Sequence, residues 1–85
     1  MPTVSMFYGI LIRMYYDDHN PPHFHAIYNN FNASFTFDGK ILEGKFPKKE
    51  LKLVEAWSII HRKELEANWL LAKNCEKLYE IKPLS

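Results

Sequence analysis

The first half of the chain alternates apolar and polar residues with the two-residue period of β-strands. Residues 9–16 carry apolar side chains on both faces, which predicts a strand in the centre of a sheet. A polar loop follows, and residues 23–28 form a second predicted strand that ends at the turn signal Asn29-Asn30. The alternation is clearest over residues 31–37, where every second residue is apolar: Phe31, Ala33, Phe35 and Phe37.

Residues 31–46 have the pattern of a β-hairpin. Asp38-Gly39 is typical of a type I′ turn, so residues 40–46 should return alongside residues 31–37. A two-residue turn pairs Phe37 with Lys40, Phe35 with Leu42, Ala33 with Gly44 and Phe31 with Phe46. This register places the aromatic side chains opposite Leu42 and Phe46, and it sets Ser34 opposite Glu43 on the solvent side.

The second half of the chain has helical periodicity. Pro47 suits the first position of a helix, and residues 48–73 contain neither glycine nor proline. The apolar stripe of residues 53–60 is rotated relative to that of residues 65–72, which predicts two helical segments or one helix kinked near His61-Arg62. The predicted fold class is α+β: a small antiparallel sheet of four strands covered by these helical segments. Residues 78–81 could add a fifth strand at the C-terminal edge.

Composition and charge narrow the functional classes. A chain of 85 residues suffices for a single domain, 1–85. Aromatic residues make up 15% of it and are favoured at interfaces, so we expect a homodimer or a complex with another protein. The net charge is only +1, whereas most nucleic-acid-binding proteins have a clear excess of basic residues. Cys75 is the only cysteine in the sequence, which excludes an intrachain disulfide. The chain shows no signal-peptide pattern and no apolar run of about 20 residues, so we expect a cytoplasmic protein without a membrane partner.

Three of the four histidines lie within the segment Asp17-Asp18-His19-Asn20-Pro21-Pro22-His23-Phe24-His25. Imidazole titrates near neutral pH and is the commonest metal ligand in proteins. Two carboxylates precede the histidines, and two prolines form a rigid corner between them. This segment is therefore the principal candidate site, with three alternative interpretations.

The first interpretation is a metal site. Residues two apart on a strand point the same way, so His23 and His25 can converge on one ion. His19, or a carboxylate from Asp17 or Asp18, could supply a third ligand across the proline corner. Three nitrogen or oxygen ligands with an open position are typical of a catalytic zinc or iron centre, so the cofactor would be a divalent transition metal.

The second interpretation is a metal-independent ribonuclease. Two of the histidines His19, His23 and His25 would act as general base and general acid, and Arg13 would stabilise the charge on phosphorus. Tyr15, Tyr16 and Phe24 could stack against unpaired bases of an RNA.

The third interpretation is structural. Asp18 caps the turn, and the histidines form hydrogen bonds with the backbone at a sheet edge or at a partner interface. Lys48 and Lys49 raise a separate question, because lysines in a first helical turn oppose the helix dipole. A bound phosphate would relieve this conflict, although a solvated helix start explains the same pattern.

The chain resembles the bacterial domain-of-unknown-function family 4160 over nearly its full length. The resemblance rests on Arg13-Met14-Tyr15-Tyr16, Asp18-His19-Asn20-Pro21-Pro22-His23-Phe24-His25-Ala26, Leu42-Glu43-Gly44, Trp57, His61-Arg62, Asn68-Trp69 and Ile81-Lys82-Pro83-Leu84. It implies a small bacterial protein encoded beside another small protein, in an arrangement similar to a toxin–antitoxin pair. The resulting hypothesis is a component that binds a cognate small protein through its histidine-rich loop and strand, with a ribonuclease toxin or a metal-binding protein as the alternatives.

Overall fold

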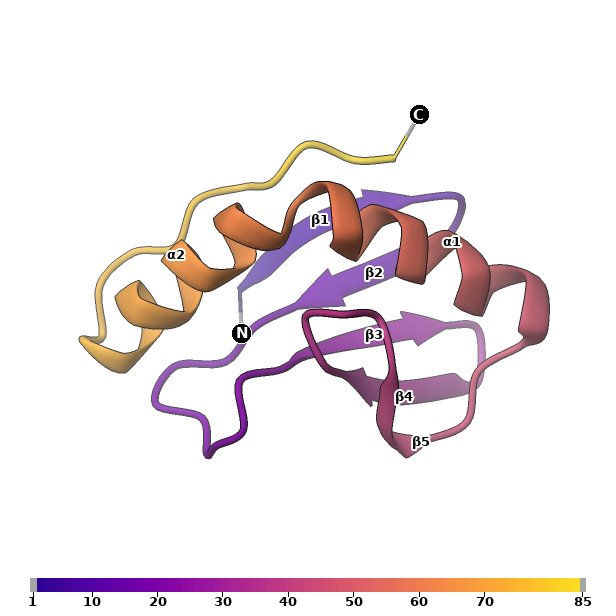
Figure 1. Ribbon diagram of the computed structural model, residues 1–85, viewed down its shortest axis with the longest axis horizontal. Helices are drawn as coiled ribbons and strands as arrows, with labels where there is room; N and C mark the ends of the chain where they lie inside the picture. The colour runs from indigo at the N-terminus through magenta and orange to yellow at the C-terminus, as the bar shows by residue number, and fades with distance from the viewer. Residues whose placement is uncertain (1, 85) are drawn as a thin grey trace.

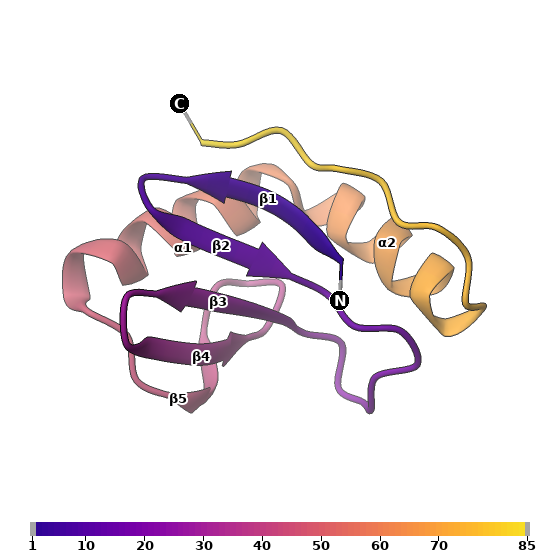
Figure 2. The same cartoon turned by 180° about the vertical axis from the view of Figure 1, so that it is seen from behind.

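The computed structural model describes residues 2–84 and contains one five-stranded antiparallel sheet and two helices. The elements are β1 (Thr3–Phe7), β2 (Ile10–Arg13), β3 (Phe24–Tyr28), β4 (Phe31–Phe35), β5 (Ile41–Gly44), α1 (Lys48–Ile60) and α2 (Arg62–Lys73). The strands lie side by side in chain order, and both helices cover the same face of the sheet (Figure 1). Seen from behind, the other face has no helix over it (Figure 2). The predicted α+β class is confirmed.

The sheet has its fifth strand at the N-terminus, where none was predicted. β1 pairs with β2 through the two-residue turn Tyr8-Gly9, in which both residues have positive φ angles of 49° and 79°. A tyrosine in this left-handed conformation is uncommon, so the sequence carried no recognisable turn signal there.

The predicted C-terminal edge strand is wrong, because residues 76–84 contain no strand. The segment does lie beside β1 (Figure 1), and the Ile81 N–H donates to the Val4 carbonyl over 2.7 Å. Helix side chains bind the backbone of two further residues. The Asn68 amide pairs with both the N–H and the carbonyl of Tyr79, and Trp57 Nε1 donates to the Lys82 carbonyl. These bonds replace the regular ladder that a strand would need.

The hairpin of β4 and β5 confirms part of the predicted register. Ala33 pairs with Gly44 and Ser34 with Glu43, but Phe35 pairs with Ile41 instead of Leu42. The reason is the turn: the Gly39 N–H donates to the Thr36 carbonyl, and the Thr36 N–H donates to the Lys40 carbonyl. The loop therefore has three residues, with Gly39 alone in the left-handed region, and the strand absorbs the extra residue as a bulge.

Gly44 holds β5 close to β4 next to this bulge. Its φ angle is +92°, and a Cβ atom at this position would lie 2.3 Å from the Asn32 carbonyl oxygen. We expect Gly44→Ala to lower the midpoint of urea unfolding strongly, because the backbone must separate. Gly9→Ala is the matched control: its φ is +79°, but the nearest atom, Tyr28 Cε1, is 3.4 Å away. That control measures only the strain of a left-handed backbone conformation, about 1–2 kcal/mol. Equal losses of stability in both variants would contradict the predicted collision of the new Cβ atom with Asn32.

The core lies between the sheet and the helices, around the fully buried Trp57 of α1. Its ring packs 5.4 Å from that of Phe7 and 5.6 Å from that of Phe24 between centroids. Of the two predicted alternatives, the structure has two helical segments, and only His61 separates them. Among residues 2–84, neither helix is long and apolar enough to cross a membrane.

Candidate functional site

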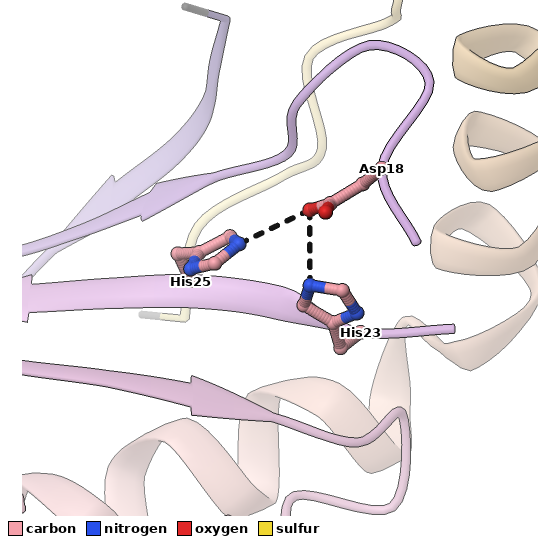
Figure 3. A group of neighbouring side chains, drawn as sticks. All are labelled: Asp18, His23 and His25. Atoms are coloured by element: carbon pink, nitrogen blue, oxygen red, sulfur yellow. Dashed lines mark hydrogen bonds and ion pairs between the residues drawn. The ribbon is translucent and has the colours of Figure 1, made fainter. Parts of the chain in front are cut away.

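The loop between β2 and β3 is attached to the C-terminal end of α2. The Asp17 N–H donates to the Ala72 carbonyl over 3.1 Å, and Lys73 Nζ donates to the Asp18 carbonyl over 2.7 Å. Asp17 itself has a positive φ of 51°, which turns the chain back toward the sheet. These contacts place the carboxylate of Asp18 over the start of β3 (Figure 3).

The Asp18 carboxylate contacts all three histidines of the segment. Its Oδ2 atom lies 2.9 Å from His23 Nε2 and 3.2 Å from His25 Nε2 (Figure 3). Its Oδ1 atom lies 3.1 Å from His19 Nδ1 and also accepts the His19 backbone N–H over 2.9 Å. The loop therefore brings three imidazoles to one anionic group.

The three rings differ in their surroundings, and only that of His25 follows from strand alternation, because His19 and His23 precede β3. Phe24 points into the core, so His25 lies on the uncovered face of the sheet. His23, just before β3, is 3% exposed, and its ring lies 5.5 Å from that of Trp69. The His19 side chain is 78% exposed. Only His23 is sealed from solvent, and His25 is partly open.

The charge state of Asp18 follows from its neighbours. Burial raises the pKa of this carboxyl group, but the hydrogen bond from His25 lowers it, as do the His19 N–H and the charges on His23 and His25. The net result is a pKa below the ordinary value of 3.8. Asp18 is therefore a carboxylate at neutral pH.

Both ring nitrogens of His23 face oxygen atoms that can only accept a hydrogen bond, so one of these two contacts requires a cation. His23 Nδ1 lies 2.7 Å from the Pro21 carbonyl oxygen, which can only accept, so we assign the ring proton to Nδ1. In a neutral ring, Nε2 then directs a lone pair at the Asp18 carboxylate, which also only accepts. Either a second proton or a metal ion between the two atoms resolves this contact.

A cleft of about 190 Å³ opens beside the histidines. It is lined by His19, Pro21, His23, His25, Ser34, Leu42 and Glu43. Neither Ser34 nor Glu43 was predicted from the sequence as a site residue. The predicted hairpin did pair them with each other. The prediction did not include the strand pairing that sets Ser34 opposite His25.

The structure does not bring every predicted residue to this cleft. Arg13 pairs with His25 across β2 and β3 but does not line the cleft, and its buried Nε has no hydrogen-bond partner among residues 2–84. Tyr15 packs edge-on against His25, with ring centroids 4.5 Å apart. The prediction that Phe24 stacks on bases is wrong, because Phe24 is fully buried in the core.

The predicted anion site at the start of α1 lies elsewhere. Lys48 and Lys49 are exposed at the start of α1, at the end of the molecule opposite the β2–β3 loop (Figure 1). They therefore do not join the histidine site. His61, between the helices, pairs with Glu64 over 2.6 Å and also stays apart from the site. The Tyr16 side chain is 44% exposed.

Comparison with known proteins identifies the family. Neither the curated proteins nor the solved structures gave a significant match. A protein-family model described as a domain of unknown function, DUF4160, matches residues 9–70, which include the whole histidine segment and both strands that flank its loop. The match covers well over half of the 85 residues, so the chain belongs to the DUF4160 family.

Proposed function

We propose that this protein binds a divalent transition metal through Asp18, His23 and His25. The observation that carries the proposal is the convergence of one ligand atom from each residue, all within 4.8 Å of one another. The two histidines flank Phe24 at the start of β3, and the aspartate comes from a loop that α2 holds in place.

The two distances from the carboxylate to the imidazoles match the edges of a coordination polyhedron. Ligand atoms bound at about 2.0–2.1 Å from one ion lie about 2.9 Å apart in an octahedron and about 3.3 Å apart in a tetrahedron. The distances from Asp18 Oδ2 to the two Nε2 atoms are 2.9 and 3.2 Å. An ion could therefore replace the protons between these atoms with small side-chain movements.

The surroundings of the three residues also suit a metal. A ligating histidine commonly donates its other ring N–H to a backbone carbonyl, as His23 Nδ1 does to Pro21. Two imidazoles and one carboxylate suit zinc or iron and leave further coordination positions for water or a ligand. These positions would face the cleft, since His23 and His25 line it.

The metal-independent ribonuclease hypothesis has less support. A general base must reach the proton that it removes, and His23 is only 3% exposed. The Nε2 atoms of His23 and His25 are both already in contact with the Asp18 carboxylate. Arg13, the expected stabiliser of phosphoryl charge, does not line that cleft.

The proposal is tested by titrating untagged, metal-free protein with Co²⁺ and following the visible absorption of the ion. We expect one equivalent to bind, and we expect His23→Ala and His25→Ala each to lower the affinity by about 100-fold or more, because each removes a direct ligand. His61→Ala is the control, since this histidine pairs with Glu64 outside the site. An equal loss in all three variants, or no stoichiometric binding, would contradict the proposal.

We also propose that the protein acts with a partner protein, as the toxin–antitoxin-like gene context of the resembled family implies. The support is a set of exposed apolar side chains on the helices: Ile59, Ile60 and Leu70 are each more than 60% exposed. Apolar groups in this position suit an interface. Analytical ultracentrifugation of the purified chain distinguishes a homodimer from a monomer that requires a different partner.

A further inference from the structure

A row of polar side chains crosses the uncovered face of the sheet next to the proposed metal site. His25 on β3 pairs with Ser34 on β4, and Ser34 pairs with Glu43 on β5. Residues paired in this way project to the same side of an antiparallel sheet. Neighbouring strands are about 4.8 Å apart, so the backbone of Glu43 lies about 10 Å from that of His25.

The cleft beside the histidines continues along this row. A second hollow, of about 210 Å³, is lined by His25, Asn32, Ala33, Ser34, Glu43 and Gly44. It shares His25, Ser34 and Glu43 with the first hollow of about 190 Å³. The two hollows therefore form one groove, which begins at the histidines and runs over β4 to β5.

The charges along the groove select the kind of ligand. No lysine or arginine lines either hollow, and Glu43 makes no ion pair among residues 2–84. A divalent ion with Asp18 as its only anionic ligand leaves a local charge of about +1 at the histidine end. The groove is then positive at the histidine end and negative at Glu43. This arrangement disfavours binding of a polyanion and favours a ligand whose negative end lies at the metal and whose positive end lies at Glu43.

We infer that this groove binds an amino acid or peptide with a basic side chain, whose carbonyl or carboxylate oxygen reaches the metal while its ammonium group pairs with Glu43. The inference rests on the proposed metal site. The four-carbon stem of a lysine has the reach that the spacing of His25 and Glu43 requires. Ser34 and Asn32 supply hydrogen-bonding groups along the way. Glu43 is thus the residue that determines specificity.

The test uses Co²⁺-loaded protein and three amino-acid hydroxamates, because a hydroxamate ligates the ion and changes its absorption spectrum. We expect lysine hydroxamate to bind about three- to fivefold more tightly than leucine hydroxamate, a range that suits a solvent-accessible ion pair. Glutamate hydroxamate should bind most weakly. Glu43→Gln should abolish the preference for lysine without changing Co²⁺ affinity, and Glu76→Gln, an exposed site outside the groove, should preserve it.

The outcomes separate the two proposals. Protein that binds no Co²⁺ would overturn the metal site and this inference together. Protein that binds one Co²⁺ but does not discriminate between lysine and leucine hydroxamates would overturn the inference alone. Tighter binding of uridine 5′-monophosphate than of lysine hydroxamate would also overturn it and would point to a nucleic-acid ligand.

Discussion

Replacing Trp57 with alanine is expected to lower the free energy of unfolding by about 3–5 kcal/mol, the range found for buried large aromatic residues. Trp57 is fully buried, and it packs against Phe7 and Phe24 from two strands of the sheet. Alanine would leave a cavity between the sheet and α1. It would also remove the hydrogen bond from Nε1 to the Lys82 carbonyl and so release part of the C-terminal segment.

Urea unfolding followed by circular dichroism measures this loss. Ile59→Ala is the matched control on the same helix, because Ile59 is 63% exposed and should cost no more than about 0.5 kcal/mol. Trp57→Phe retains most of the ring volume and removes the N–H donor. Its loss in free energy of unfolding should therefore fall between those of Trp57→Ala and Ile59→Ala. A Trp57→Ala variant as stable as Ile59→Ala would show that α1 does not pack on the sheet as described.

Asp18→Asn is expected to lower the affinity for Co²⁺ by about 100-fold or more. The substitution keeps the shape of the side chain but removes the only negative charge among the three proposed ligands. Asp17→Asn is the control, because Asp17 is the adjacent acidic residue and lies outside the ligand set. Equal affinities of the Asp18→Asn and wild-type proteins would show that the carboxylate does not bind the ion.

The same variant should alter the acid stability of the metal-free protein. Because the folded pKa of Asp18 lies below its ordinary value, its carboxylate stabilises the fold above about pH 3.8. That contribution is lost as the pH falls through the folded pKa. The Asp18→Asn protein lacks it, so its free energy of unfolding should fall less steeply with acid over this range. Urea midpoints measured in EDTA between pH 2 and 6 test the difference.

The pattern of apolar residues predicted most of the fold because the pattern is local. Alternation over residues 31–37 identified β4 and part of its pairing with β5, and the helical periodicity of residues 48–73 identified the helical region. The errors occurred where backbone conformation overrides pattern. Tyr8 adopts a positive φ angle that its residue type disfavours, so β1 was missed. The turn at Asp38-Gly39 has three residues instead of two, which shifted the pairing of Phe35.

By itself, the sequence determined where the candidate site lies, since three histidines occur within seven residues of the chain. It left open which acidic residue would join them. Only the tertiary structure selects Asp18, because the contacts of Asp17 and Asp18 with α2 orient the loop. Likewise, only the order of the strands brings Glu43 into the same cleft as the histidines. The position of the histidine segment is encoded by short-range spacing in the sequence. The contacts that add Asp18 and Glu43 join residues distant in sequence, so they arise only when the chain has packed.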